Sequence, residues 1–365
     1  MLPISVVYLA PMTIRMLPAY DGDCLLLTLP QPAGPARHIL IDGGPGRTYR
    51  QLAQEIQKLQ RNNQVIDLLI ITHIDDDHIG GILKLFEDPI FDPTLIKQVW
   101  FNSGAMLAKQ LDDLYATSRE VALYPQADTH ISVTQGNTLE RYLQQVAGWN
   151  ETLIHVGTAP LHWENLKITV LSPDYQSLDK LHKHWPAAYA VATPVSSSAT
   201  DYARSIEELN ALPQCSEDQA VCNGSSIAIL LETTMANLLF LGDAHPSVVA
   251  VSLKRLGYSA AKPLEAAFIK IAHHGSRYNT NTELLSLWRC QHYAISTNGL
   301  KHGFPHKECL AKLIGHSAPG VTLYFNYPVA TERAIFSARD YEQYSFACVE
   351  LATADHTIEL PQYAP

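Results

Sequence analysis

The chain alternates short apolar runs with longer segments in which apolar residues recur at helical spacing. Residues 12–42 hold apolar segments separated by polar turns, a pattern typical of β-hairpins. Further along, β-branched apolar runs predict buried strands, and amphipathic segments predict helices between them. The predicted strands are 65–72, 96–101, 166–171, 267–272 and 292–297, and the predicted helices are 47–62, 78–88, 104–119, 138–148, 246–256 and 282–288. This alternation indicates an α/β fold.

The second half of the chain repeats the plan of the first. Two apolar runs, 226–232 and 237–241, predict another hairpin. The segment 174–222 is polar, contains a run of serines and carries one predicted helix, so we interpret it as an insertion rather than a linker. Because the chemistry-bearing motifs are spread from position 21 to position 274, we predict one large domain over residues 1–365.

One predicted strand runs directly into a dense group of charged residues. After 65–72, the chain places His73, Asp75, Asp77 and His78 in a strand-to-helix turn. In open α/β sheets, the turns at the carboxyl ends of strands are where ligands collect. A solvated acidic helix start would explain Asp76 or Asp77 but not the two histidines. Imidazole and carboxylate together indicate a divalent metal site.

Two later strand ends carry residues of the same chemistry. Asp243 follows the run 237–241 through one glycine, although it could instead cap the helix predicted to begin at Pro246. His273 and His274 follow the strand 267–272. Adjacent residues at a strand end point in opposite directions, so we expect one histidine to bind metal and the other to support it. We slightly favour His273 as the ligand.

The first motif resembles the His-x-His-x-Asp-His signature of the metallo-β-lactamase-fold hydrolases, with Asp75 in place of the second histidine. This replacement is similar to the subgroup found in the soluble domain of the competence protein that imports DNA. The following segments agree with that subgroup in order along the chain: Asp21-Gly-Asp, Ile41-Asp-Gly-Gly, Asn223-Gly-Ser-Ser, Leu241-Gly-Asp and Ala272-His-His-Gly-Ser. The resemblance covers about residues 12–325 and implies a four-layer αβ/βα sandwich.

The resemblance also implies how two divalent metal ions would be held. It assigns His73, Asp75 and Asp243 to one ion, and Asp77, His78, Asp243 and one of His273 and His274 to the other. Many family members add a histidine between the first motif and the bridging aspartate. No histidine of this chain matches that context, but Asn223 could reach the open side of the first ion. We expect zinc, with manganese a serious alternative because carboxylates suit harder ions.

The paired metals lead us to expect a dinuclear hydrolase. Because the subgroup resembles nucleic-acid-linked hydrolases and paired metals suit in-line displacement at phosphorus, the expected enzyme is a phosphodiesterase or nuclease in which a metal-bridging hydroxide attacks phosphorus. Asp77 would help hold the proton of the hydroxide, and His306 would donate a proton to the leaving group. Backbone amides at Gly275, Ser276 and Arg277 would hold a phosphate. The alternatives are a hydrolase of carboxylic esters or lactones, a mononuclear iron oxygenase, and a non-catalytic binding module.

Composition narrows the class of partner. The formal net charge of −10 argues against strong non-specific binding to duplex DNA and favours a small phosphodiester or a single-stranded nucleic acid as substrate. No apolar stretch approaches the roughly 20 residues of a membrane span, and no convincing signal peptide is present, so we expect a cytoplasmic protein without a membrane partner. The six cysteines lack zinc-knuckle spacing and are predicted to be free thiols, although Cys215 and Cys222 could pair or contact metal.

Overall fold

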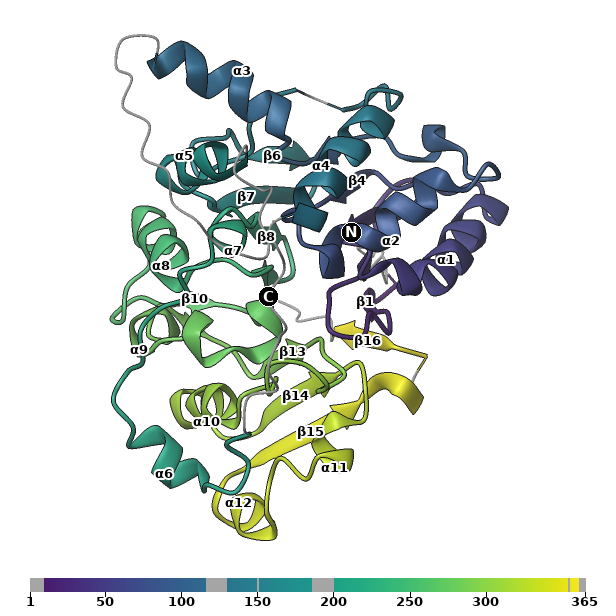
Figure 1. The fold of residues 1–365 in the computed structure, drawn as a ribbon. Helices are drawn as coiled ribbons and strands as arrows, with labels where there is room; N and C mark the ends of the chain where they lie inside the picture. Colours follow the sequence, from purple (N-terminus) through teal and green to yellow (C-terminus); the bar gives the residue numbers. More distant parts are fainter. Residues whose placement is uncertain (1–9, 116–129, 150, 186–199, 354, 361–365) are drawn as a thin grey trace, which may run out of the picture.

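The computed structural model describes residues 10–115, 130–149, 151–185, 200–353 and 355–360, which form two main sheets with helices on their outer faces (Figure 1). The first sheet runs in the order β16 (Thr357–Leu360), β1 (Met12–Met16), β2 (Leu25–Leu29), β3 (Arg37–Ile41), β4 (Leu68–Ile70) and β5 (Val99–Trp100). The predicted hairpins are present, since β1, β2 and β3 pair antiparallel. The C-terminal strand β16 completes the edge beside β1.

The second sheet is larger and mostly parallel at its centre. Its order is β15 (Phe346–Glu350), β14 (Val321–Phe325), β13 (His292–Ile295), β11 (Phe268–Lys270), β9 (Asn237–Phe240), β8 (Ala228–Thr233), β7 (Leu166–Ser172) and β6 (Leu161–Trp163). The pair β8 and β9 is the second predicted hairpin. Strands β9, β11, β13 and β14 run parallel, so their carboxyl ends meet at one edge of the sheet.

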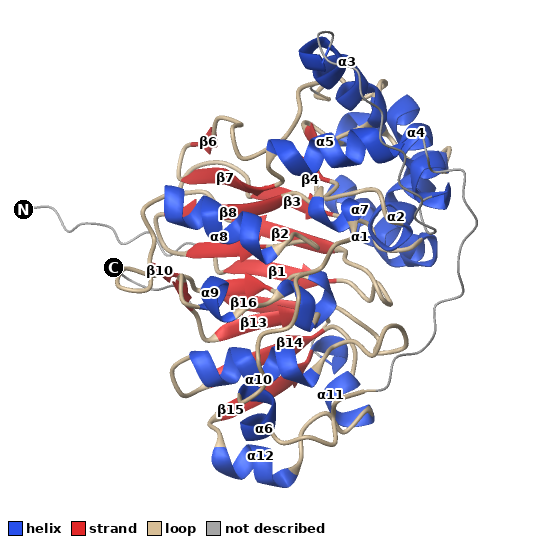
Figure 2. Ribbon diagram, turned by 60° about the vertical axis from the view of Figure 1, so that its left-hand side comes forward, coloured by secondary structure: helices blue, strands red, loops and turns tan. Residues whose placement is uncertain are grey.

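Helices cover the outer face of each sheet, as Figure 2 shows. On the first sheet they are α1 (Tyr49–Arg61), α2 (Asp76–Glu87), α3 (Gly104–Tyr115) and α4 (His130–Leu143). On the second they are α8 (Pro246–Arg255), α9 (Thr282–Leu285) and α10 (Lys307–His316). Two shorter helices, α11 (Val329–Glu332) and α12 (Ala338–Gln343), follow near the C-terminus. Helix α4 begins earlier than its predicted bounds of 138–148, and part of the predicted helix 104–119 lies outside the described residues.

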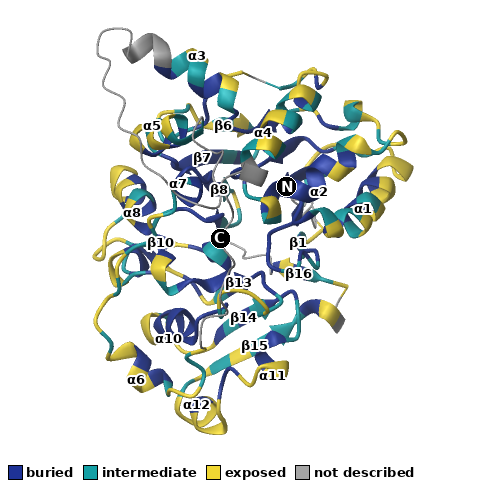
Figure 3. Ribbon diagram, in the orientation of Figure 1, coloured by how far each residue is buried: buried dark blue, intermediate teal, exposed yellow. Residues whose placement is uncertain are grey.

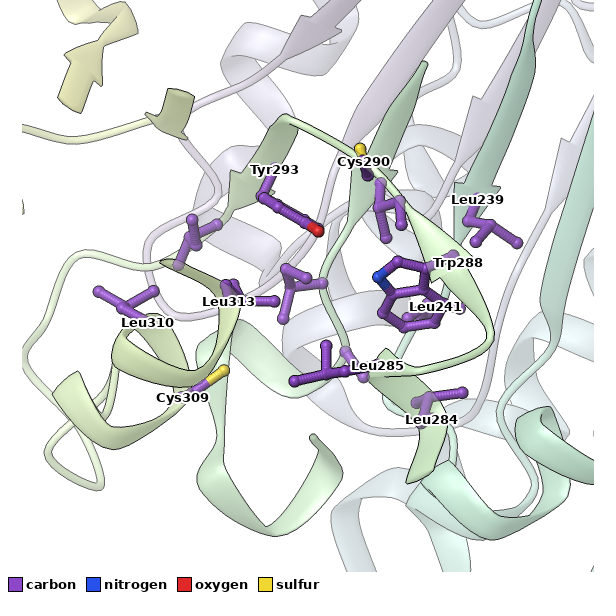
Figure 4. Packing of buried hydrophobic residues seen from close by; sticks show 14 of the residues in the cluster. Leu239, Leu241, Leu284, Leu285, Trp288, Cys290, Tyr293, Cys309, Leu310 and Leu313 are labelled. Carbon is purple, nitrogen blue, oxygen red and sulfur yellow. The ribbon is translucent and has the colours of Figure 1, made fainter. Parts of the chain in front are cut away.

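The buried side chains form three apolar layers, which define a four-layer sandwich. Alternate residues of one strand point to opposite faces of a sheet. Leu238 and Phe240 of β9 therefore pack between the two sheets, whereas Leu239 and the adjoining Leu241 pack beneath α9 and α10 (Figure 4). A third layer lies between the first sheet and its helices. The buried strands and exposed outer helix faces in Figure 3 agree with this arrangement, so the predicted α/β sandwich is confirmed.

The segment 174–222 contributes to both halves of the molecule. Its helix α5 (Tyr175–His184) and the short helix α7 (Val221–Gly224) pack with the apolar layer of the first sheet. Its helix α6 (Ile206–Asn210) packs against α10 of the second half. No helix in the described part of the chain combines the length and the apolar character needed to cross a bilayer.

Candidate metal centre

The first motif lies where β4 leads into α2. The strand is shorter than the predicted 65–72, and the backbone of Asp75 is still extended at the N-cap position before the helix begins at Asp76. Helix α2 can approach the neighbouring loop closely because a Cβ on Gly81 would lie only 1.9 Å from the carbonyl oxygen of Gly43. The absence of a side chain at Gly81 therefore lets the N-terminal part of α2 lie against the loop that follows β3.

Asp243 enters the site through a tight turn after β9. Gly242 has a φ of +50°, and a Cβ there would lie 2.4 Å from Oγ of Ser226. The backbone N–H of Asp243 donates to that same Oγ at 2.9 Å. The N-cap residue of α8 is His245, so the carboxylate of Asp243 does not cap this helix.

The two consecutive histidines after β11 do not continue the strand. His273 and His274 have positive φ angles of 45° and 55° and form a short 3₁₀ turn with Gly275. The expectation that they point in opposite directions was wrong, because left-handed backbone at both residues replaces the alternation of a strand. Both rings now face Asp243.

The strand ends converge on one carboxylate oxygen. The Nε2 atoms of four histidines lie close to Oδ2 of Asp243, at 3.9 Å for His73, 3.5 Å for His78, 3.8 Å for His273 and 3.8 Å for His274. Asp75 is nearest to His73, with 3.5 Å between its Oδ2 and Nε2. Asp77 lies on the other side, with its Oδ2 3.6 Å from Nε2 of His274 and 4.0 Å from Nε2 of His78.

Three of these imidazoles have the hydrogen-bonding pattern of metal ligands. The Nδ1 atoms of His73, His78 and His274 lie 3.0 Å from Oγ1 of Thr72, 2.8 Å from Oδ2 of Asp42 and 2.8 Å from the carbonyl of Ser296. Their Nε2 atoms are buried and have no hydrogen-bond partner among the residues that the structure describes. A partner on one ring nitrogen fixes the tautomer and leaves the other lone pair for a metal ion. The residues therefore fit divalent cations.

Two groups of candidate ligand atoms overlap at His78. His73, His78 and Asp243 can approach one cation, and Asp77, His78 and His274 can approach another. This places His274, rather than the favoured His273, beside Asp77 and His78. Coordination by each of these side chains stays a prediction.

The electrostatics of the cluster also favour added positive charge. Burial alone would raise the pKa of Asp243, but the surrounding histidines hold it well below its usual range. Burial would lower the pKa of His274, yet Asp243, Asp23 and Asp77 raise it to about 10. Carboxylates that stabilise protonated imidazoles this strongly would also stabilise divalent cations at the same place.

The centre is buried on one side and open on the other. The side chains of His73, His78 and Asp243 are at most 4% exposed, whereas those of Asp75 and Asp77 are 33% and 28% exposed. Solvent therefore reaches the centre from the side of these two aspartates.

His273 stands apart from the other three histidines. It joins none of the candidate ligand groups, and its Nδ1 lies 3.0 Å from Oδ1 of Asn279 and 3.3 Å from Oδ2 of Asp218. Asn223, predicted to reach the first ion, instead donates its amide to Asp218 at 2.7 Å and lies 3.4 Å from Nδ1 of His273. The amide nitrogen of Asn223 therefore supports the surroundings of His273.

The predicted phosphate-holding amides are not available. The backbone N–H groups of Gly275 and Ser276 donate to the carbonyls of Ala272 and His273, and the N–H of Arg277 donates to Nδ1 of His306. These N–H donors are already used by hydrogen bonds within the tight turn after β11 and to His306. The prediction that they hold a phosphate was therefore wrong. Oγ of Ser276 accepts the N–H of Tyr278.

The side chain of Arg277 is also engaged within the protein. Its guanidinium donates to the hydroxyl of Tyr278 at 2.9 Å and lies 3.7 Å from Oε2 of Glu308. The guanidinium of Arg277 therefore faces α10.

His306 does not face solvent, as a residue that donates a proton to a leaving group would. It is buried, its Nδ1 accepts the N–H of Arg277 at 3.2 Å, and its ring lies 5.1 Å from that of Phe304. Burial and the nearby Arg277 lower the pKa of His306 to about 4. At neutral pH it is thus uncharged and helps to hold the loop after His274 in place.

Sequence reasoning missed residues that surround the ligands. Asp42, in the Ile-Asp-Gly-Gly segment, accepts the N–H and the hydroxyl of Thr72 in addition to facing His78. Its position after a strand was the available signal. Asp218 lies in a loop and Asn279 ends a short 3₁₀ helix that begins at Arg277, and neither follows a periodic pattern, so only tertiary structure shows them. All six cysteines, including Cys215 and Cys222, are free thiols, as predicted.

Comparisons with known proteins agree with this assignment over the first part of the chain. Residues 18–119 match the model of the metallo-beta-lactamase superfamily, and this range contains the first motif. A search of curated proteins found no relative.

Two solved structures show distant likeness. Zinc-bound PqqB from Methylobacterium extorquens is 13% identical, with a TM-score of 0.41, and the alignment covers 96% of this chain and 100% of that one. A mutant of the CmlA beta-hydroxylase is 11% identical, with a TM-score of 0.37 and coverage of 96% and 54%. This chain thus spans about half the length of CmlA.

Proposed function

We propose that the chain is a metal-dependent hydrolase that holds two divalent ions and cleaves phosphodiesters. The observation that supports this most directly is the convergence of four imidazole Nε2 atoms within 3.9 Å of Oδ2 of Asp243. Three of those nitrogens are buried without a hydrogen-bond partner. The match of residues 18–119 to the metallo-beta-lactamase superfamily supports the same class of chemistry.

The residues divide into two sets in this proposal. Asp243 lies between them and would be shared, His73 and Asp75 would complete the first set, and Asp77, His78 and His274 the second. Two bound divalent ions would lower the pKa of a water molecule and stabilise the charge that grows on the attacked phosphate. Zinc is the expected metal and manganese the alternative, because both imidazole and carboxylate ligands are offered.

The protein itself would orient the ligands and admit the substrate. Through contacts with Nδ1, Thr72 fixes the ring of His73 and Asp42 fixes that of His78. The carbonyl of Ser296 fixes the ring of His274 in the same way. Asp77 lies on the exposed side, where its carboxylate could accept a proton from the attacking water. A small phosphodiester or a single nucleic-acid strand would enter from that side.

Hydrolysis of bis-p-nitrophenyl phosphate in the presence of manganese or zinc tests the proposal. Two variants, His73→Ala and Asp243→Ala, should lower turnover at least about 100-fold, because each removes a direct ligand from the catalytic ions. The matched control is His162→Ala, which changes an exposed histidine on β6 remote from the centre.

Unchanged turnover in both ligand variants would exclude this centre as the active site. Turnover of p-nitrophenyl acetate or a lactone by the wild type, without turnover of any phosphodiester, would retain the hydrolase but contradict the substrate class.

A further inference from the structure

A buried ion pair lies directly behind the candidate metal centre. The ammonium of Lys270, at the end of β11, is 2.6 Å from Oδ2 of Asp23 and donates to the carbonyl of Ile271 at 3.0 Å. Both side chains are 1% exposed. Removing two charges from water costs free energy that their mutual attraction often fails to offset. The Lys270–Asp23 pair is therefore better explained by the charges of the neighbouring metal centre than by any stabilisation of the fold that the pair itself provides.

Asp23 turns its other oxygen toward the metal centre. Within the described part of the chain, Oδ1 of Asp23 has no hydrogen-bond partner, and it lies 3.6 Å from Nδ1 of His274. The carboxylate offers a ligand atom within 4.8 Å of those of Asp243 and His274, and belongs to a second such group with Asp42 and His78. By geometry alone, Asp23 could take part in binding a further cation.

With its histidines neutral, as binding of metal ions requires, the centre contains much more negative than positive charge. Six carboxylates lie in or against it, those of Asp23, Asp42, Asp75, Asp77, Asp218 and Asp243. Among the described residues, Lys270 contributes the one lysine or arginine ion pair made by any of the six. Its ammonium sits where a cation would otherwise be needed to balance Asp23.

We propose that the Lys270 ammonium serves as a fixed third cation of the metal centre, where it balances Asp23 and sets how tightly the two metal ions are held. Asp23 is then left to position His274, whose Nδ1 it faces alongside the carbonyl of Ser296. Both residues are positioning residues. The inference depends on the proposed two-ion centre but not on the identity of the substrate.

This role predicts opposite effects for the two partners. With Lys270→Met, the charge of Asp23 is uncompensated, so added divalent ions should bind more tightly. With Asp23→Asn, an uncompensated ammonium faces the ions, so they should bind more weakly. A unit charge at this range changes cation affinity by about tenfold or more. A pair that only stabilised the fold would weaken metal binding in both variants.

The test is titration of metal-free protein with Mn²⁺ or Zn²⁺ in competition with a chromophoric chelator. We expect about tenfold tighter binding for Lys270→Met, about tenfold weaker binding for Asp23→Asn, and binding within about threefold of wild type for the double variant. The matched control is Lys307→Met, which breaks an equally buried pair with Asp340 at 2.7 Å, remote from the centre. Its metal affinity should not change.

Weaker binding in both single variants, or equal affinities in all proteins, would overturn the inference. If Lys270→Met is unfolded without metal, recovery of its far-ultraviolet circular dichroism with added Mn²⁺ replaces the titration; failure to recover would also overturn it. Because no substrate is used, a wild type that binds two ions but hydrolyses no phosphodiester would contradict the proposed reaction and leave this inference intact.

Discussion

At the scale of single residues, the centre depends on side chains that hold the ligands as much as on the ligands themselves. Asp42 is fully buried and connects His78 to Thr72, which in turn faces His73. One carboxylate thus orients two candidate ligands. Residues that play this part typically change metal affinity by 10- to 100-fold when removed.

Removal of the Asp42 carboxylate should therefore weaken metal binding. We expect Asp42→Ala to lower the affinity for Zn²⁺ or Mn²⁺ by about 10- to 100-fold, because His78 loses the acceptor that fixes its ring. Competition with a chelator measures this. The matched control is Asp76→Ala in the first motif, whose carboxylate accepts from Gln135 and takes part in none of the ligand groups. Equal loss in both variants would contradict the assigned role of Asp42.

Asp218 offers a second prediction at this scale. Its carboxylate accepts amide hydrogen bonds from Asn223 at 2.7 Å and Asn279 at 3.1 Å and faces His273. Replacement by alanine should lower phosphodiester turnover about tenfold while two ions remain bound, since His273 lies outside the ligand groups. Turnover and metal content, measured on the same sample, check this. Loss of one ion from Asp218→Ala would instead make His273 a ligand.

At the scale of elements, the sequence predicted the strands that carry the site better than their lengths. Buried apolar runs are clear in sequence, so β4, β9 and β11 were found. Their ends were placed too late, because apolar residues such as Ile71 and Leu241 are buried beyond the last strand residue. Each still donates its backbone N–H to the end of the neighbouring strand, at Trp100 and Lys270. The left-handed turn at His273 and His274 gave no signal either, since neither residue is the glycine such backbone favours.

Close contact between α2 and the first sheet gives a prediction about packing. A Cβ on Gly81 would lie 1.9 Å from the carbonyl oxygen of Gly43, so Gly81→Ala must displace α2 and the ligands at its N-terminus. We expect a loss of about 1–3 kcal/mol in the free energy of unfolding together with weaker metal binding. Gly46→Ala, whose Cβ would have no neighbour closer than 3.5 Å, is the control for chemical denaturation. Equal stability of the two variants would contradict the packing.

A histidine within β3 gives a prediction about pH. His38 is buried with its Nε2 unpartnered, and burial lowers its pKa although Asp67 opposes the shift. A histidine whose pKa is lower in the folded than in the unfolded protein contributes stability above about pH 6.5, and this stability is lost as the pH falls. Metal-free wild type should therefore lose more stability between pH 7.5 and 5.5 than His38→Asn does. Urea denaturation at both pH values would show this, and identical losses would contradict it.

At the scale of the whole molecule, the two sheets pack face to face and bring distant segments together. The first motif belongs to the first sheet, whereas Asp243, His273 and His274 belong to the second. The sequence showed these groups separately, and their order resembled a known fold. It could not show that Asp218 of the insertion, or Lys270 paired with Asp23, would complete the surroundings, because those contacts arise only when the sheets pack.

Because the centre joins both halves, metal binding should stabilise the whole chain. Each site saturated to 100 times its Kd contributes about 2.7 kcal/mol to the free energy of unfolding. Thermal unfolding should therefore occur at higher temperature with added Zn²⁺ or Mn²⁺ and at lower temperature with a chelator. The metal-dependent shift should shrink in Asp243→Ala. If the unfolding temperature of the wild type changes neither with added metal nor with added chelator, this coupling is contradicted.

The most direct test of the two-ion centre is elemental analysis of the chain after reconstitution with excess metal and removal of unbound ions. We predict two divalent ions per chain in the wild type and a clear loss in Asp243→Ala, whose carboxylate would be shared by both. A wild type that retains no ion or only one would contradict the two-ion centre.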